Sequence, residues 1–355
     1  MTKYLSADEH RRLTEPEYYE GRKSVDLDLV DAGYHGGAPE DRHRLARKIE
    51  EAALETGKDE IISVTAGASE SRSLRAMVST NGFEGYEEQT GFWCGAEATA
   101  RDGGDKRPED WWYEGYRHRS ELSDPAEIGR KAALRALDRV GADKIPTGEL
   151  PLIVENRTCG RILRYFGQAM NGNMLQQKRS FLEGMEGKQV WAEHVSVTDD
   201  PFIKRGQGSR LFDEEGISAR KLPMIESGVL RNYYIDTYYG RKLGRKATTG
   251  SSSNVVLVSK KVKSVEAWVK ELGRGILVTG FLGGNSNSAT GDFSTGIQGF
   301  LFENGEIARP VAAMNLAGNH LEFWKKLRGL GDDPYPFSSF RSPSLVFEPM
   351  VIAGA

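Results

Sequence analysis

The stretch that decides the fold is GILVTGFLGGNSNSATGDFSTGIQGFLFENGEIARPVAAMNLAGN, residues 275–319. It contains two short apolar runs of the kind that forms β-strands, residues 276–279 and 299–303. Asn304-Gly305 supplies the two positive φ values of a type I′ hairpin turn, so a return strand is expected after it. Residues 283–291 are rich in glycine, asparagine and serine, which predicts a long polar loop. We therefore expect an antiparallel sheet that carries one exposed loop.

Outside this stretch, helix and strand patterns follow one another without a regular βαβ alternation. Helices are expected at residues 39–57, 125–140, 160–170, 265–272 and 320–330, from apolar spacing and from their start and stop residues. Strands are expected at residues 61–64, 74–79, 91–99, 152–154, 190–197, 221–226, 229–237 and 344–351. The predicted fold class is α+β.

The length of 355 residues predicts two domains, because it exceeds what one hydrophobic core usually organises. The composition changes between Val140 and Pro151. We therefore predict an N-terminal domain of α/β type over residues 1–145. Residues 146–355 are expected to form a mainly antiparallel β domain with a few helices.

Composition and charge indicate a globular chain with no special affinity for membranes or nucleic acid. The mean hydropathy is −0.52, and no apolar run reaches membrane length or forms a signal peptide. We therefore expect a cytoplasmic protein. The net charge of −3 gives no electrostatic reason to bind nucleic acid. The two cysteines, Cys94 and Cys159, are too few for a disulfide framework and are expected to be buried apolar residues.

Common catalytic motifs are missing from the sequence, whereas carboxylates are locally dense. There is no phosphate-binding P-loop, no dinucleotide fingerprint, no G-x-S-x-G and no H-E-x-x-H. Asp213 stands in the run Phe-Asp-Glu-Glu-Gly, residues 212–216, and Asp292 follows Gly291. Such acids can bind a hard cation, act as an acid/base pair or accept hydrogen bonds from turn amides. The residues alone leave these alternatives open for Asp213 and Asp292, whereas Asp199-Asp200-Pro201 favours the turn role.

An ordered set of short motifs resembles the TldD/PmbA family, also called modulator of DNA gyrase. In chain order they are STNGFEG (79–85), WWY (111–113), SFL (180–182), DDP (199–201), FDEEG (212–216), YGRKLG (239–244), TGDFS (290–294), ENGEI (303–307), PV (310–311) and AGN (317–319). Each motif is weak alone, but their order and spacing match from about Leu5 to the last residue.

The resemblance implies a two-component zinc peptidase that acts on unfolded peptides. In that family the TldD-like subunit holds zinc through a His-Glu-x-x-x-His helix and a cysteine near the C-terminus. Its PmbA or TldE-like sister lacks these ligands, and the two form a heterodimer around the chamber where peptides are cleaved.

This chain resembles the metal-free sister, because residues 160–172 read GRILRYFGQAMNG in the place of the ligand helix. Arg164 and Gln168 fall near the ligand positions. Arginine stays protonated and cannot donate a lone pair, and glutamine is a poor zinc ligand. Residues 331–342 contain no cysteine. We therefore expect no metal and no catalytic residue in this chain, with zinc held by a TldD-like partner.

The resemblance also suggests where a peptide or partner binds. A peptide extended along a sheet edge is bound through its backbone without sequence preference. The hypothesis is that a cavity shared with the partner is lined by Asp213, Glu215, Asn285, Asn287 and Asp292.

Two departures from the family pattern are expected to matter. Family members usually begin with a further α/β segment, so the N-terminal domain is expected to be shortened here. The family's Ser-Thr-Gly-Asn-Ala stretch is replaced by TTGSSSN, residues 248–254, so backbone recognition there is expected to differ.

Three readings follow from these observations. The first is the non-metal subunit of a TldD/TldE-type metallopeptidase for unfolded peptides. The second is a peptide-binding or scaffold homodimer that has lost the protease function. The third is an autonomous hydrolase that uses the carboxylates around Asp213 with a metal.

Overall fold

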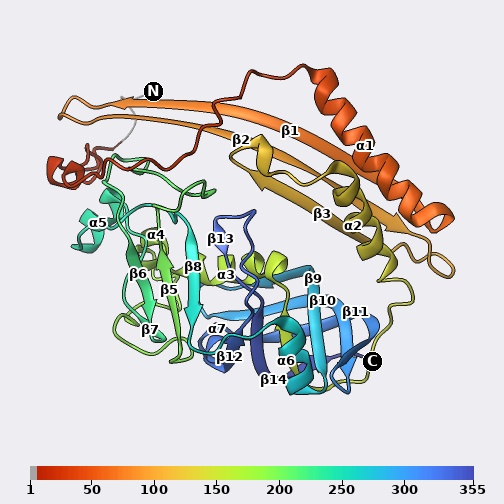
Figure 1. The fold of residues 1–355 in the computed structure, drawn as a ribbon. Helices are drawn as coiled ribbons and strands as arrows, with labels where there is room; N and C mark the ends of the chain where they lie inside the picture. The colour runs from red at the N-terminus through yellow and green to blue at the C-terminus, as the bar shows by residue number, and fades with distance from the viewer. Residues whose placement is uncertain (1–5) are drawn as a thin grey trace.

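The computed structural model describes residues 6–355 as three β-sheets with helices between and around them (Figure 1). Met1 to Leu5, the first residues of the predicted N-terminal domain, lie outside the described residues. The helices are α1 (Pro39–Gly57), α2 (Pro125–Leu137), α3 (Asn156–Ala169), α4 (Gly172–Gln176), α5 (Thr237–Leu243), α6 (Val265–Leu272) and α7 (His320–Phe323). The strands are β1 (Ile61–Val78), β2 (Glu84–Ala100), β3 (Glu109–Tyr116), β4 (Gly148–Val154), β5 (Val195–Asp199), β6 (Leu222–Glu226), β7 (Val229–Leu230), β8 (Val255–Ser259), β9 (Gly275–Ser286), β10 (Asp292–Glu303), β11 (Glu306–Asn319), β12 (Leu327–Leu330), β13 (Phe340–Arg341) and β14 (Leu345–Ala353). Mixed helices and largely antiparallel strands confirm the α+β class.

The first sheet has the order β1-β2-β3 and is antiparallel, with α1 and α2 packed on it. Pro39 starts α1, and the side chain of Asp124 caps α2 by accepting from the backbone N–H of Ala126. The two helices touch closely at Gly129, where an added Cβ would lie 2.1 Å from the backbone oxygen of Ile49. This sheet and its helices form one layer above the rest of the chain (Figure 1).

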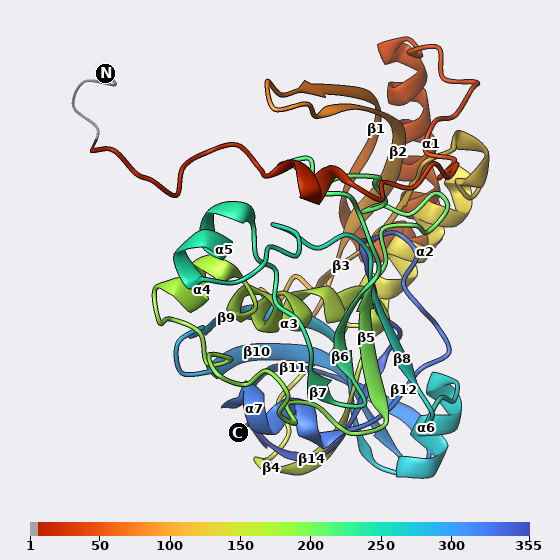
Figure 2. The same ribbon diagram turned by 90° about the vertical axis from the view of Figure 1, so that its left-hand side faces the viewer.

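The other two sheets belong to the second half of the chain. One has the order β11-β10-β9-β4-β14-β12, and the other has the order β13-β8-β5-β6-β7. They share a large core that includes Leu152, Phe166, Trp191 and Trp324. Helix α3 lies between the first sheet and these two sheets (Figures 1 and 2). It therefore sits where the two halves of the molecule meet.

The hairpin predicted around Asn304-Gly305 is confirmed. Strands β10 and β11 pair antiparallel, and the turn between them has φ of 53° at Asn304 and 79° at Gly305. The predicted loop of residues 283–291 is shorter than expected, because β9 extends to Ser286. The loop therefore spans only residues 287–291. At Gly284 a Cβ would lie 2.7 Å from the backbone oxygen of Ser294, so glycine there permits close strand pairing.

Other predicted elements are wrong in their extent. Residues 61–64 and 74–78 belong to the single strand β1, which pairs with β2 along almost its whole length, and Ser79 lies just beyond its end. Residues 320–330 form only the short α7, a 3-10 turn at Trp324–Lys326 and then β12, which pairs with β14. Residues 190–194 precede β5, and β7 ends at Leu230. Tertiary pairing decides these segments more than local pattern does.

Within residues 6–355, no helix is both long and apolar enough to cross a membrane.

Candidate functional site

Helix α3 organises the candidate site, because its two faces have opposite chemistry. Its buried face consists of Cys159, Ile162, Leu163, Phe166 and Ala169, which join the large core. The other positions carry cations and an amide at Arg157, Arg161, Arg164 and Gln168. The helical period separates these two sets, so the apolar face fixes the direction of the polar one.

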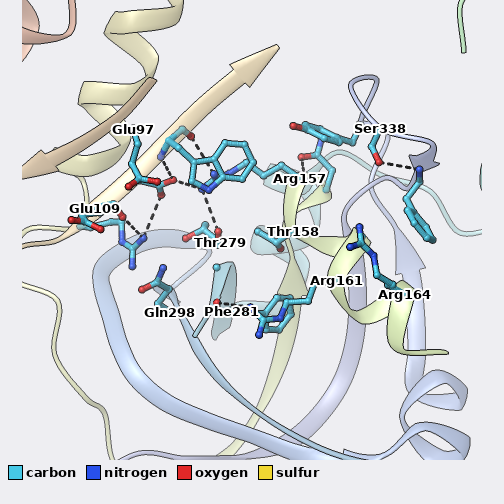
Figure 3. Close-up of a pocket in the computed structure, with 18 of the residues that line it drawn as sticks. Glu97, Glu109, Arg157, Thr158, Arg161, Arg164, Thr279, Phe281, Gln298 and Ser338 are labelled. Atoms are coloured by element: carbon cyan, nitrogen blue, oxygen red, sulfur yellow. Dashed lines mark hydrogen bonds and ion pairs between the residues drawn. The ribbon is translucent and has the colours of Figure 1, made fainter. Parts of the chain in front are cut away.

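A cavity of about 680 Å³ lies along the polar face of α3. Its walls come from β2 and β3 of the first sheet, from α3, from β9 and β10, and from residues 335–340. In Figure 3, Arg161 and Arg164 extend from α3 on one side, and Glu97 and Glu109 lie on the other. The cavity is therefore built by segments far apart in the sequence.

One group of arginines in this cavity is committed to buried ion pairs. The Arg157 Nη2 lies 2.6 Å from Asp110 Oδ1, and its Nε lies 2.7 Å from Glu155 Oε2. The Arg139 Nη1 lies 3.7 Å from Asp110 Oδ2, and burial lowers the pKa of Arg139. The Arg157 guanidinium also lies 4.4 Å from the centre of the Trp111 ring. These contacts join the first sheet to α3.

Arg161 and Arg164 differ, because neither lies within ion-pair distance of a carboxylate anywhere in residues 6–355. Arg161 Nη1 donates to the backbone oxygen of Phe281 at 3.1 Å, and its Nη2 donates to that of Gly283. Arg164 is exposed, and its guanidinium lies 5.9 Å from the centre of the Phe340 ring. Two positive charges therefore face the cavity without an ion-pair partner among residues 6–355, across from the carboxylates of Glu97 and Glu109 on the opposite wall.

A second cavity of about 250 Å³ adjoins the first, and Arg164 and Phe340 line both. Its walls are mostly apolar: Leu163, Phe166, Met170, Trp191, Val197, Met224, Ile225 and Val255. Gln168, Asn171 and residues 250–252 supply polar groups. The Nε1 of Trp191 is buried and has no hydrogen-bond partner among the described residues. Unpaired buried donors are rare in folded proteins.

The two positions near the expected ligand sites, Arg164 and Gln168, both lie on α3 and line the second cavity. They lie four residues apart, about one helical turn. A guanidinium and a neutral amide do not fit a zinc ion, because the first carries a positive charge and the second is a weak ligand.

Asp213 and Glu215 lie elsewhere and hold loops together. The Asp213 carboxylate is buried and accepts from the N–H groups of Glu215 and Ile217 at 2.9 and 3.0 Å, and from the Thr249 hydroxyl at 3.0 Å. Glu215 accepts from the N–H and hydroxyl of Thr237 at 2.7 and 2.9 Å, and burial raises its pKa. The contacts of Asp213 match the turn role among the alternatives for this acid, whereas Glu215 bonds to the start of α5.

Asn285, Asn287 and Asp292 lie at the end of the β9–β10 hairpin. Asn285 pairs with Ser294 across the strands, and the Asn287 Oδ1 accepts from the Ala289 N–H at 2.9 Å. Asp292 is exposed, and hydrogen bonds from Asn319 and Thr290 lower its pKa. Neither cavity along α3 is lined by these three residues or by Asp213 and Glu215. Their proposed role concerns a cavity shared with a second chain, and it stays a prediction.

The histidines and cysteines do not gather into a metal site within residues 6–355. In the part of the chain that the structure describes, no three His, Cys, Asp or Glu side chains form a group that could hold a metal ion. His320 is buried between Ser286 and Trp324, with its two ring nitrogens 3.0 and 3.2 Å from their polar atoms. Both cysteines are buried, and burial raises the pKa of Cys94 to about 12 and that of Cys159 as well.

Several residues of the cavity were not expected as site residues. They are Asp110, Arg139, Arg157, Tyr335 and Phe340, and they come from four separate segments. The motif WWY at 111–113 was one signal, since Trp111 lines the cavity. The positions of the other cavity residues depend on how the first sheet packs against α3.

Comparison with known proteins was made for the sequence and for the fold. A family model described as the PmbA/TldA metallopeptidase C-terminal domain matches residues 147–354, and one for the central domain matches residues 38–140. The chain is 31% identical to the metalloprotease PmbA of Escherichia coli O157:H7, over 97% of this chain and 78% of the relative. It is 30% identical to a metalloprotease PmbA homolog of Haemophilus influenzae, with the same two coverages.

Two solved structures give the same picture of the fold. A protein from Bacteroides thetaiotaomicron, described as a modulator of DNA gyrase, has a TM-score of 0.94 and 38% identity, over 100% of this chain and 80% of that one. TldE from Thermococcus kodakarensis has a TM-score of 0.87 and 24% identity, over 100% of this chain and 82% of that one. The second comparison supports the fold alone.

Proposed function

The chain belongs to the PmbA/TldD metallopeptidase family, as its motifs predicted, and on this premise we propose that it is the non-metal-binding, PmbA/TldE-like subunit of a two-component peptidase. In this proposal a TldD-like chain holds the zinc and this chain helps to bind the substrate. The substrate is an unfolded peptide, which is either matured or degraded.

The observation that carries the proposal is the chemistry of α3. The helix presents Arg161, Arg164 and Gln168 to the cavities. Two positive charges without an ion-pair partner oppose the approach of a divalent cation to this helix, because like charges repel strongly where water is partly excluded. Neither arginine has a free lone pair for a metal. The same charges favour anionic or strongly polar groups of a ligand, so this helix suits binding better than metal-assisted hydrolysis.

The shape of the site also supports a peptide ligand. The larger cavity is polar and open enough for an extended backbone, and the smaller one has apolar walls for a side chain. Pockets that combine apolar walls with a few convergent polar groups are typical of binding sites.

The test is metal analysis and cleavage of an unfolded peptide by the purified chain, alone and mixed with a TldD-like protein. We expect stoichiometric zinc and cleavage only in the mixture. A mixture in which the TldD-like protein has first been stripped of zinc is the control, and it should be inactive until zinc is restored. Size-exclusion chromatography with light scattering then reports whether the two chains associate.

Two outcomes contradict the proposal. If the isolated chain binds stoichiometric metal and cleaves the peptide, it is an autonomous hydrolase and the Asp213 region becomes the place to mutate. If it forms a stable homodimer that ignores the TldD-like protein, the scaffold function replaces the subunit function.

A further inference from the structure

We propose that the two cavities along α3 together bind the C-terminal residue of a peptide, with its free carboxylate on Arg164 and Arg161 and its apolar side chain in the smaller cavity. This inference rests on the proposed function, since it takes a peptide as the ligand, and it names the part of the peptide that this chain recognises.

The carboxylate half rests on the contrast between the arginines of the larger cavity. Arg157 and Arg139 are neutralised by Asp110 and Glu155 at distances of 2.6 to 3.7 Å. Arg161 donates to the backbone oxygens of Phe281 and Gly283 and to the Tyr165 hydroxyl, all of them uncharged. Arg164 stacks on Phe340 without an acceptor among residues 6–355. Arginine favours carboxylates because its planar donors match both carboxylate oxygens. Arg161 and Arg164 are three residues apart on a helix, so they lie on neighbouring parts of one face.

The side-chain half rests on the walls of the smaller cavity. Leu163, Val197, Met224 and Val255 are buried residues that leave about 250 Å³ of space between them. Burial of an apolar side chain there removes its surface from water, which is favourable.

The two halves are joined by Arg164 and Phe340, which line both cavities. In one amino acid the carboxylate and the side chain leave the same Cα, so a C-terminal residue reaches both sides of this pair at once. An internal residue supplies the side chain without the charge. The geometry therefore favours a free, apolar C-terminus over an internal segment.

The first experiment measures binding of short fluorescein-labelled Gly/Ser peptides by fluorescence anisotropy. One peptide ends in leucine with a free carboxylate, a second is its C-terminal amide, and a third ends in serine. We expect the leucine acid to bind about tenfold more tightly than the amide, since charge-assisted hydrogen bonds are lost. We expect a similar factor between leucine and serine, from the loss of apolar burial. Equal affinity for acid and amide would overturn the carboxylate assignment.

Variants separate the two halves of the site. Arg164→Gln should bind acid and amide nearly equally, whereas Arg274→Gln, an exposed arginine paired with Glu303 away from both cavities, should behave as the native chain does. Gly167→Leu should fill the smaller cavity, because an added Cβ at Gly167 meets nothing within 4 Å and the position is helical. It should abolish the leucine preference and keep the preference for the acid. An unchanged leucine preference in Gly167→Leu would overturn the side-chain assignment.

Failure of this inference is distinguishable from failure of the proposed function. Binding is measured on this chain alone and needs no partner, whereas the subunit role is measured by cleavage in the mixture. Cleavage in the mixture without an acid or leucine preference leaves the subunit role standing and removes the C-terminal site.

Discussion

The two ends of the polar face of α3 carry the same residue type in opposite settings. Arg157 and Arg164 are about two helical turns apart and point to the same side of the helix. The Arg157 side chain is 2% exposed and paired with Asp110, which is 3% exposed, whereas Arg164 is exposed and stacked on Phe340. Burial and pairing, and not residue type, decide that the first arginine contributes to the fold and the second is available to a ligand.

The largest expected change in the free energy of unfolding is at Arg157, the arginine that is paired with Asp110. Arg157→Met removes one partner of a buried ion pair and leaves Asp110 with the longer contacts to Arg139 and Arg135 as its only charged partners, beside the hydrogen bond from the Trp111 N–H. Breaking a buried pair in this way should lower the free energy of unfolding by about 4 kcal/mol. Urea denaturation followed by circular dichroism measures it. A loss below about 1 kcal/mol would show that Arg139 and Arg135 satisfy Asp110 without Arg157.

The next largest expected change in stability comes from comparing a buried carboxylate, Asp213, with an exposed one, Asp292. Asp213→Ala leaves the N–H groups of Glu215 and Ile217 without this acceptor and the Thr249 hydroxyl with only the 3.3 Å contact to the Ser251 oxygen, and should cost about 3 kcal/mol in the free energy of unfolding. Asp292→Ala is the matched control, because Asp292 is exposed and its partners can turn to water. Its expected cost is below about 1 kcal/mol. Equal costs for both would contradict the distinction between buried and exposed acids.

A smaller effect concerns a buried group that titrates. Burial lowers the pKa of His320 from 6.5 to about 4. The unfolded chain therefore binds a proton between these pH values that the folded chain does not, so stability is fully present above pH 6.5 and is lost as the pH falls. From pH 7 to pH 5 the loss should be about 2 kcal/mol. Denaturation across this range checks it, and His320→Gln should remove this part of the slope. The same slope in the variant would assign it to other groups.

The smallest expected change in the free energy of unfolding is at Arg164, which has no ion-pair partner among residues 6–355. Arg164→Gln should change the free energy of unfolding by less than about 0.5 kcal/mol, since no ion pair or hydrogen bond of the described residues is lost. The same denaturation experiment measures it. A loss near that of Arg157→Met would mean that Arg164 contributes to the fold, and the comparison would fail.

The sequence predicted the parts of the fold whose signals are local. Pro39 and Gly57 bound α1 as expected, and Asn304-Gly305 forms the predicted turn. It could not predict that residues 327–330 form a strand, because their apolar residues suit a helix equally well until β14 pairs with them. Gly283 and Gly284 indicated a loop, although they lie inside β9, where both have positive φ at an irregularity in its pairing with β10.

The candidate site was predictable only along one helix. Arg164 and Gln168 share a face because helical spacing places them there. Asp110 and Phe340 reach the same cavity from segments about 50 residues before and 180 residues after α3, and no periodicity connects such distant positions. The pairing of Arg157 with Asp110 could therefore not be predicted from the sequence.

The burial of Cys94 and Cys159 has a practical consequence for labelling chemistry. Thiol reagents attack the thiolate, and both native thiols are covered by protein and weakly acidic. The folded chain should therefore react slowly with maleimides. A single Gln168→Cys substitution would then give one fast-reacting position beside the two cavities, where a fluorophore reports on whatever enters them.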